Sequence, residues 1–326
     1  MMLRKLLGSV RKKVISPLKY LINLTDPPVL VLLYHRVTSL PSDPEMLAVS
    51  PDNFRSQMLF LKKTFPVVRF EENWAKVPKP AVAITFDDGY ADNALEALPI
   101  LEEVGLPATF FVSTGTIGSL KEFWWHELER LILEKQDTPL SFTLEDDRCG
   151  RVWPSGNLKE RQEFYQGIVQ LMTNADTAQR DNWLAQLRRW ASAEDAISDT
   201  HRAMTLQELR LLSMSKWVTI GAHTVTHTQL SSLSPDKQRE EIVASKQQLE
   251  AWLDREVSAF SYPFGRRCHY TSETVTLCRE AGFTKVAANF PGQAHRWTDP
   301  LQIPRHLIRN WPIETFTEKL RGFWTR

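Results

Sequence analysis

Short apolar runs alternate with amphipathic stretches along most of the chain after the Pro27-Pro28 pair. The runs are rich in β-branched and small residues, whereas apolar residues in the stretches between them recur at helical spacing. This alternation is typical of a parallel β/α fold. The predicted strands are 29–34, 67–70, 81–86, 108–112, 217–222, 258–262, 283–288 and 302–308. The predicted helices are 54–65, 93–104, 235–254, 272–281 and 313–323.

The alternation is interrupted once, between residues 119 and 204. Most of this stretch has helical spacing, and only 140–144 has a weak strand pattern. We therefore interpret 119–204 as a mainly helical insertion in a β/α core. Tryptophan faces suit stacking on sugar rings but more often pack in a core, and both interpretations stay open for this stretch. Five of the chain's 11 tryptophans fall within it: Trp124, Trp125, Trp153, Trp183 and Trp190.

The first 20 residues differ in charge from the rest of the chain. They contain six basic residues and no acidic one, with leucines and valines at helical spacing between them. The segment 1–26 is predicted to contain a basic amphipathic helix, which rests on an anionic membrane surface, docks on the domain or serves as an organellar transit peptide. It lacks the continuous apolar stretch and the cleavage site of a secretory signal. We expect a cytoplasmic protein, either free or peripheral at the inner face of the membrane.

Composition narrows the class of protein. The 326 residues are 42% hydrophobic and 24% charged, which is typical of a folded globular chain. The 40 basic residues nearly balance the 39 acidic ones, so nucleic acid is not an expected partner. Cys149, Cys268 and Cys278 have no spacing that indicates a zinc knot or a disulfide framework, which favours a reducing compartment.

Four predicted strands end in residues that can carry out chemistry. In a parallel β/α fold the carboxyl ends of the strands meet at one face, where active sites form. We therefore expect the four strand ends to contribute to a single site. They are Tyr34-His35-Arg36, Phe86-Asp87-Asp88-Gly89, Ala222-His223 and Tyr262-Pro263-Phe264.

Two of these strand ends together indicate a metal site. Asp87 and Asp88 are adjacent carboxylates, which taken alone are more typical of an ordinary turn. His223 and His227 are four residues apart after a predicted strand, and an isolated pair of this kind is more often structural. In combination, Asp88 and the two histidines form a two-histidine, one-carboxylate set with positions left open for water and substrate. Such a set suits a catalytic Zn²⁺ or a related divalent ion.

The strand-end motifs resemble those of the polysaccharide deacetylase family, also called carbohydrate esterase family four. Thr85-Phe86-Asp87-Asp88-Gly89 and His223-Thr224-Val225-Thr226-His227 resemble its first two motifs, and Tyr262-Pro263-Phe264-Gly265 resembles its third. The resemblance extends over about 28–323, apart from the insertion. It implies a distorted (β/α) barrel of the polysaccharide deacetylase type within 27–326, interrupted by the mainly helical insertion.

The resemblance also implies an activity, the metal-dependent removal of acyl groups, usually N-acetyl groups, from sugars. By position, Asp88, His223 and His227 would bind the metal, most simply Zn²⁺. Asp87 would be the general base, and the backbone N–H of Phe264 would help to hold the oxyanion.

The general acid is where the sequence departs from the common family pattern. The family usually places this histidine in a late apolar-x-His motif, and the corresponding stretch, Ile303-Pro304-Arg305-His306, fits poorly. A branch that includes poly-N-acetylglucosamine deacetylases has it on an early strand, which Leu33-Tyr34-His35-Arg36-Val37 resembles. We assign His35 as the general acid and keep His306 as the alternative.

A second departure concerns the arginine that orients the base in the family's third motif. Ser261 stands at that position. Arg305 alternates with apolar Ile303 and Leu307, so it either points into the barrel as a replacement or lies on the surface. Asp92 either orients a neighbouring residue or starts the following helix.

We expect a metal-dependent hydrolase that removes an acyl group from an acetylated sugar, an oligosaccharide or a lipid-linked glycan. N-deacetylation in polysaccharide or glycolipid biosynthesis fits best, with deformylation and O-deacetylation as close variants. The alternatives are an amidohydrolase on a small non-sugar amide and a non-catalytic glycan- or membrane-binding module on the same fold. The presence of Asp87, Asp88, His223 and His227 argues against the binding module.

Overall fold

The computed structural model describes residues 22–76, 80–119, 122–146, 150–193 and 199–325. The basic helix predicted within 1–26 therefore falls almost entirely outside the described residues, and so does Cys149. Among the helices in these ranges, none is both long enough and apolar enough to cross a membrane.

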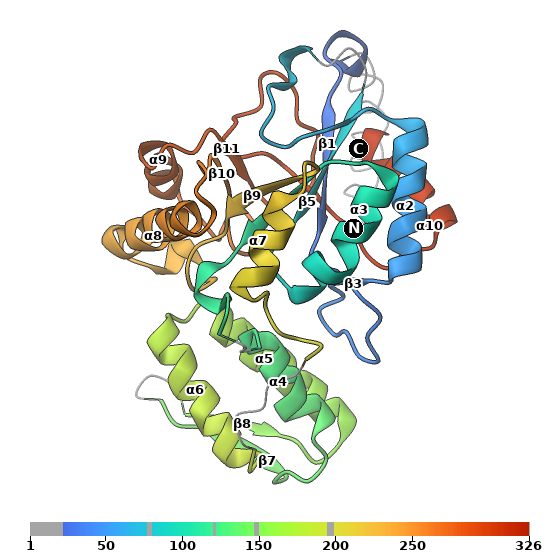
Figure 1. Ribbon diagram of the computed structural model, residues 1–326. Helices are drawn as coiled ribbons and strands as arrows, with labels where there is room; N and C mark the ends of the chain where they lie inside the picture. The colour runs from blue at the N-terminus through green and yellow to red at the C-terminus, as the bar shows by residue number, and fades with distance from the viewer. Residues whose placement is uncertain (1–21, 77–79, 120–121, 147–149, 194–198, 326) are drawn as a thin grey trace, which may run out of the picture.

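A parallel sheet of eight strands forms the centre of the molecule (Figure 1). Its strands follow the order β11-β10-β9-β6-β5-β1-β12, and β4 pairs with β5 beside this path. Every residue of β1 and β5 is buried, as expected for parallel strands covered on both faces. The strands are β1 (Val29–Tyr34), β4 (Val67–Val68), β5 (Ala81–Phe86), β6 (Ala108–Val112), β9 (Val218–Ala222), β10 (Ala259–Ser261), β11 (Lys285–Ala287) and β12 (His306–Leu307).

One short segment closes this sheet into a distorted barrel. Its Ile303 pairs in parallel with Ala287 of β11, and three residues later its His306 pairs with β1. Between the two pairings stands Pro304, which has no N–H to donate to a neighbouring strand. The segment changes partner at this point, and the predicted strand 302–308 is therefore reduced to the two residues of β12.

Helices surround the sheet, with α2, α3 and α10 on one side and α8 and α9 on the other (Figure 1). α2 begins earlier than predicted, because the side chain of Ser50 accepts a hydrogen bond from the N–H of Asn53 and Pro51 occupies the first turn. The predicted helix 93–104 divides into the π-helical η2 and α3, and α7 was not predicted. The helices are α2 (Pro51–Thr64), η2 (Asn93–Ala97), α3 (Leu98–Val104), α7 (Leu206–Met214), α8 (Pro235–Leu253), α9 (Ser272–Glu280) and α10 (Ile313–Thr325).

The insertion folds as a lobe at one end of the barrel (Figure 1). Its buried apolar residues, among them Phe142, Phe164 and Leu187, form a core separate from that of the barrel. The strand Arg151–Pro154, which pairs with the predicted strand 140–144, was not predicted from the sequence. Three of its four residues are exposed, and its residues do not alternate between apolar and polar. The lobe contains α4 (Trp124–Leu128), η4 (Glu129–Glu134), α5 (Leu158–Thr173), α6 (Thr177–Trp190) and the antiparallel pair β7 (Ser141–Leu144) and β8 (Arg151–Pro154). The architecture is the predicted distorted (β/α) barrel with a mainly helical insertion.

Candidate metal centre and active site

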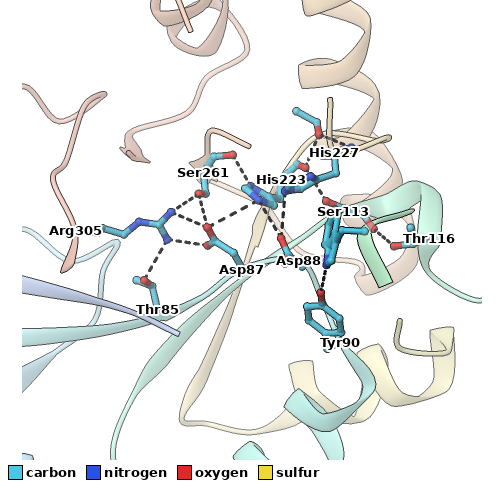
Figure 2. Close-up of polar contacts among 12 residues, drawn as sticks. Thr85, Asp87, Asp88, Tyr90, Ser113, Thr116, His223, His227, Ser261 and Arg305 are labelled. Atoms are coloured by element: carbon cyan, nitrogen blue, oxygen red, sulfur yellow. Dashed lines mark hydrogen bonds and ion pairs between the residues drawn. The ribbon is translucent and has the colours of Figure 1, made fainter. Parts of the chain in front are cut away.

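The three predicted metal ligands converge at the carboxyl ends of β5 and β9 (Figure 2). Nε2 of His227 lies 3.3 Å from Oδ1 of Asp88, and Nε2 of His223 lies 3.5 Å from the same oxygen. All three side chains are buried, and each offers a ligand atom within 4.8 Å of the other two. The spatial relation that a shared ion requires is therefore present.

One hydrogen bond at this triad directs a lone pair of His223 toward its centre. Nδ1 of His223 lies 2.7 Å from the carbonyl oxygen of Ser261, which only accepts, so Nδ1 carries the hydrogen and Nε2 presents a lone pair. Oδ1 of Asp88 is buried and has no hydrogen-bond donor within the described ranges. Burial lowers the pKa of His227, which favours its neutral, liganding form. Converging acceptor atoms of this kind suit a divalent cation, and the donor set fits Zn²⁺.

Left-handed backbone conformations aim these side chains. Asp88 has φ of +79° and Gly89 has φ of +92°, so the chain turns sharply after β5 and sends the carboxylates of Asp87 and Asp88 in different directions. In the loop after β9, Thr224 and His227 have φ of +63° and +50°. Residues other than glycine lose about 1–3 kcal/mol each in such conformations and keep them only where the surroundings hold them in place.

Two charged side chains hold the loop after β9. Glu241 of α8 accepts hydrogen bonds from the N–H groups of Val225, at 2.8 Å, and Thr226, at 2.9 Å. Buried Arg180 of the insertion helix α6 donates to the carbonyl oxygens of Thr226, at 3.3 Å, and His227, at 3.4 Å. The insertion thus helps to hold the backbone of a predicted metal ligand. Neither charged residue was singled out from the sequence, because each is separated from the loop by residues of another element.

Asp87 lies in a buried ion pair beside the triad (Figure 2). Arg305 donates two parallel hydrogen bonds of 2.7 Å to its two carboxylate oxygens, and the Arg305 side chain also donates to Oγ of Ser261 at 2.8 Å. Burial raises the pKa of Asp87, but the charge and hydrogen bonds of Arg305 outweigh it and hold the pKa below its ordinary value. Asp87 is therefore ionised. The sequence left open whether Arg305 points into the barrel or lies on the surface. In the structure it points into the barrel.

The two candidate general acids face different parts of the molecule. His35 lines the cavity in front of the triad, and its Nδ1 is buried without a partner in the described part of the chain. Burial lowers its pKa, and the charges of Asp88 and Asp87 oppose that shift. His306 instead stacks on Phe323 of α10, with ring centroids 3.9 Å apart, and does not line this cavity. The placement favours His35.

The third motif forms a tight turn beside the triad. Phe264 and Gly265 both have left-handed backbones, with φ of +59° and +60°. A Cβ at Gly265 would lie 2.6 Å from the backbone nitrogen of Asn289, so only glycine fits there. The Phe264 ring lies 4.8 Å from that of His227, centroid to centroid, and Phe264 lines the cavity.

A buried polar network that the sequence did not reveal joins the end of β1 to the insertion. Nε of Arg36 lies 2.9 Å from Oδ2 of Asp92, and the guanidinium of Arg36 lies 4.5 Å from the centre of the Tyr90 ring. Oδ1 of Asp92 accepts the N–H of Val37 at 3.0 Å, and its side chain makes no cap hydrogen bond to the following helix. Asp92 therefore orients its neighbours. The hydroxyl of Tyr90 lies 2.9 Å from Nε2 of His126 in α4.

Known proteins resemble this chain in sequence. A family model described as "Polysaccharide deacetylase" matches residues 75–135 and 188–286, and its gap falls within the insertion. The chain is 22% identical over 289 residues to "Putative polysaccharide deacetylase YxkH" of Bacillus subtilis (strain 168). The matched region covers 86% of this chain and 71% of that protein.

Two solved structures have the same fold. The first is a "putative polysaccharide deacetylase BA0330" from Bacillus anthracis, with a TM-score of 0.58 and 18% identity over 90% of this chain and 69% of that one. The second is the Streptococcus pyogenes deacetylase PplD in complex with acetate, with a TM-score of 0.56 and 19% identity over 90% of this chain and 98% of that one. The matched segments of the family model contain the motifs of Asp87, Asp88, His223 and His227. Over these matched segments the chain carries a polysaccharide deacetylase domain.

Proposed function

We propose that the protein is a metal-dependent N-deacetylase that removes the acetyl group from an amino sugar of an oligosaccharide or lipid-linked glycan. The observation that carries this proposal is the different environment of two adjacent carboxylates. Asp88 faces two imidazoles whose Nε2 atoms converge on one of its oxygens, whereas Asp87 is ionised against Arg305 within the same buried site. The polysaccharide deacetylase domain supports sugar deacetylation, and the acetate in the Streptococcus pyogenes deacetylase supports acetyl as the acyl group.

Each carboxylate then has a separate task. A divalent ion held by Asp88, His223 and His227 would activate a water molecule and polarise the acyl carbonyl. Oδ2 of Asp87 lies 3.9 Å from Nε2 of His223, so the ionised carboxylate stands at the edge of the triad. Asp87 takes the proton from the attacking water, and Arg305 keeps its carboxylate in one orientation.

Two further groups complete the reaction. His35 lines the same cavity, which supports it as the group that would protonate the leaving amine. The backbone N–H of Phe264, in the left-handed turn beside His227, would donate to the oxyanion that develops on the former carbonyl oxygen of the acyl group.

The biosynthetic setting is the finer part of this proposal. Six basic residues without an acidic one in the first 20 support attraction to an anionic membrane surface. A substrate that is assembled on a lipid at the inner membrane face fits this charge pattern, as part of polysaccharide or glycolipid biosynthesis.

A panel assay tests the proposed activity. The full chain is stripped with a chelator, reloaded with Zn²⁺ and incubated with N-acetylated sugars, oligosaccharides and lipid-linked intermediates, and the loss of acetyl mass is measured. Asp87→Asn is expected to abolish turnover and retain the metal, whereas Asp88→Asn is expected to lose both. The proposal fails if no substrate loses an acyl group, or if Asp88→Asn binds the metal as tightly as the unchanged protein.

A further inference from the structure

The amino ends of the barrel strands lie opposite the candidate metal site. β1 and β5 pair in register along their whole length, and Asp87 and Asp88 directly follow the last pair. Since a strand rises about 3.3 Å per residue, the first pair, Val29 and Ala81, is roughly 17 Å from the last. Ala294 pairs with Val29 at this end, and Figure 1 shows the start of the described chain here, away from the insertion. This end of the barrel takes no part in the proposed reaction.

A short segment ahead of β1 is fixed to the loop 294–299 at this end. The carboxylate of Asp26 accepts hydrogen bonds from the backbone N–H of Arg296, at 3.1 Å, and from its side chain, at 2.9 Å. The carbonyl oxygen of Asp26 also lies 3.0 Å from Nδ1 of His295. The segment and the loop therefore form one continuous surface.

Two large apolar side chains of this surface are exposed to solvent. Trp297 is 72% exposed, and Leu24, ahead of β1, is 64% exposed. The Trp297 ring stacks on the His295 ring, with centroids 5.0 Å apart and an angle of 5° between the planes, so its position is set by the loop. Tryptophan is enriched where proteins meet the headgroup region of a membrane, because its ring is apolar and its N–H is polar.

Exposed basic side chains lie at the same end of the barrel. The last turns of α2 and α10 meet there, since the ring of Phe65 stacks on that of Trp324 at 5.4 Å, and the side chain of Asn23 donates to the carbonyl oxygen of Trp324 at 3.3 Å. The exposed Asp299 bonds its own loop and accepts from the side chain of Gln302 at 2.9 Å. The exposed basic residues are Lys63, Arg296 and Arg321.

The sequence that leads into this end is also basic. Residues 1–21 directly precede Ile22, and the first 20 carry six basic residues and no acidic one. Positive charge therefore enters the barrel beside Leu24 and Trp297. An anionic lipid surface matches this combination, because apolar side chains bury at the level of the headgroups while basic ones are attracted to the lipid charge.

The insertion also exposes apolar side chains, but with the opposite charge around them. Next to Leu158, Lys159 is paired with Glu163 at 3.8 Å. The insertion 119–204 contains 11 basic and 15 acidic residues, so an anionic bilayer repels it. Its large exposed apolar residues are Leu140, Val152 and Leu158.

We propose that Leu24 and Trp297, together with the basic segment 1–20, form a membrane-binding face that rests on an anionic lipid bilayer. The inference rests on the membrane setting of the proposed function and not on its chemistry. With this face on the bilayer, the cavity in front of the triad opens away from the membrane. The acetylated sugar is then separated from the lipid surface by at least the length of the barrel strands.

Co-sedimentation of the full chain with lipid vesicles tests this face. Vesicles of phosphatidylcholine and phosphatidylglycerol in equal parts are compared with vesicles of phosphatidylcholine alone. The variants are Leu24→Ser, Trp297→Ala and Trp297→Phe, and the matched control is Leu158→Ser in the insertion, where the side chain is 65% exposed. Circular dichroism confirms that each variant is folded. Acetate release from soluble N-acetylated oligosaccharides is measured alongside.

We expect the unchanged protein to bind the anionic vesicles about tenfold or more better than the neutral ones. Leu24→Ser and Trp297→Ala should each weaken this binding by about fivefold or more, whereas Trp297→Phe and Leu158→Ser should leave it within about twofold. An unchanged protein that does not bind anionic vesicles overturns the membrane-binding face and favours docking of the basic segment on the domain. Binding that neither Leu24→Ser nor Trp297→Ala weakens, or that Leu158→Ser weakens equally, also overturns it.

The same experiment separates this face from the proposed activity. None of the variants should change acetate release, because the altered residues lie at the other end of the barrel from the triad. The expected pattern of vesicle binding without any acetate release would support the membrane-binding face and overturn the proposed activity. Acetate release together with vesicle binding that depends on neither Leu24 nor Trp297 would do the reverse.

Discussion

Arg305 provides the sharpest test of how the proposed general base, Asp87, is held. Its side chain makes five hydrogen bonds: two to Asp87, one each to the hydroxyls of Ser261 and Thr85, and one to the carbonyl of Ala288 at 2.8 Å. Arg305 is 1% exposed and Asp87 is 4% exposed, so water does not replace these bonds when the guanidinium is removed. Arg305→Ala leaves a buried carboxylate without its counter-charge.

The expected cost follows from this burial. Breaking a buried ion pair by removing one partner destabilises a protein by about 3–5 kcal/mol, and we expect Arg305→Ala to lower the free energy of unfolding by that amount. The loss of an oriented base should lower kcat by about 10²–10⁴-fold. Zn²⁺ affinity should change little, because the Arg305 side chain makes no hydrogen bond to Asp88, His223 or His227. Arg305→Lys keeps the positive charge but lacks the two-pronged guanidinium group. Its stability and kcat should therefore lie between those of the unchanged protein and those of Arg305→Ala.

Arg161 supplies a matched control. It is also a buried arginine, 7% exposed, and it donates to the carbonyls of Ser155, at 3.0 Å, and Gln136, at 2.9 Å, in the insertion. Arg161→Ala should lower stability while kcat per folded, metal-loaded molecule stays near that of the unchanged protein. Denaturant unfolding, metal analysis and steady-state kinetics of both variants form the assay. A normal kcat in Arg305→Ala, or complete loss of Zn²⁺, would refute the assignment of Arg305 to the base.

The other predictions concern separate parts of the site. His35→Ala should lower kcat by about 10²–10⁴-fold at unchanged metal content, whereas His306→Ala should leave kcat near its original value; kinetics showing the reverse order would transfer the general acid to His306. Arg180→Met should weaken Zn²⁺ binding by about 10–100-fold, as measured by chelator competition, because His227 loses a backbone partner, and Arg188→Met in the same helix should not. Burial lowers the pKa of His126 to about 3 and of His306 to about 4. The unfolded state therefore binds more protons below pH 6.5, and unfolding free energy should fall by up to about 1.4 kcal/mol per pH unit for each histidine between pH 6.5 and 4. His306→Ala should flatten this slope in acid denaturation series, and an unchanged slope would exclude its contribution.

The site residues that could be predicted from the sequence are those in the loops that follow the strands. Asp88, His223 and Phe264 are found at one face because the carboxyl ends of parallel strands meet there, and this rule needs only the positions of the strands. The same rule identified His35. The fold was predictable for the same reason, since long apolar strands and intervening amphipathic helices leave few alternatives to a β/α barrel.

The residues that support the site could not be found in this way. Arg180 is 47 residues from His227, and its contact depends on how the insertion docks on the barrel. Arg36 and His126 contact Tyr90 from two different elements, and each is an ordinary residue in its local sequence. Side chains of this kind act through tertiary packing, which leaves no periodic pattern in the chain.

Ser261 and Arg305 are two aspects of one arrangement. The two hydrogen bonds to Asp87 depend on where the guanidinium group lies and not on which strand carries the arginine. Side chains from several strands can reach the interior of a barrel. The segment between β11 and β12 leaves one partner strand for another around Arg305, so this residue turns inward at the level of Asp87. Its guanidinium then lies 2.8 Å from Oγ of Ser261 and occupies the space that a longer side chain at that position would need. A small residue at 261 is therefore what an arginine at 305 requires, and we propose that Arg305 takes the role of the arginine that the family resemblance led us to expect at position 261.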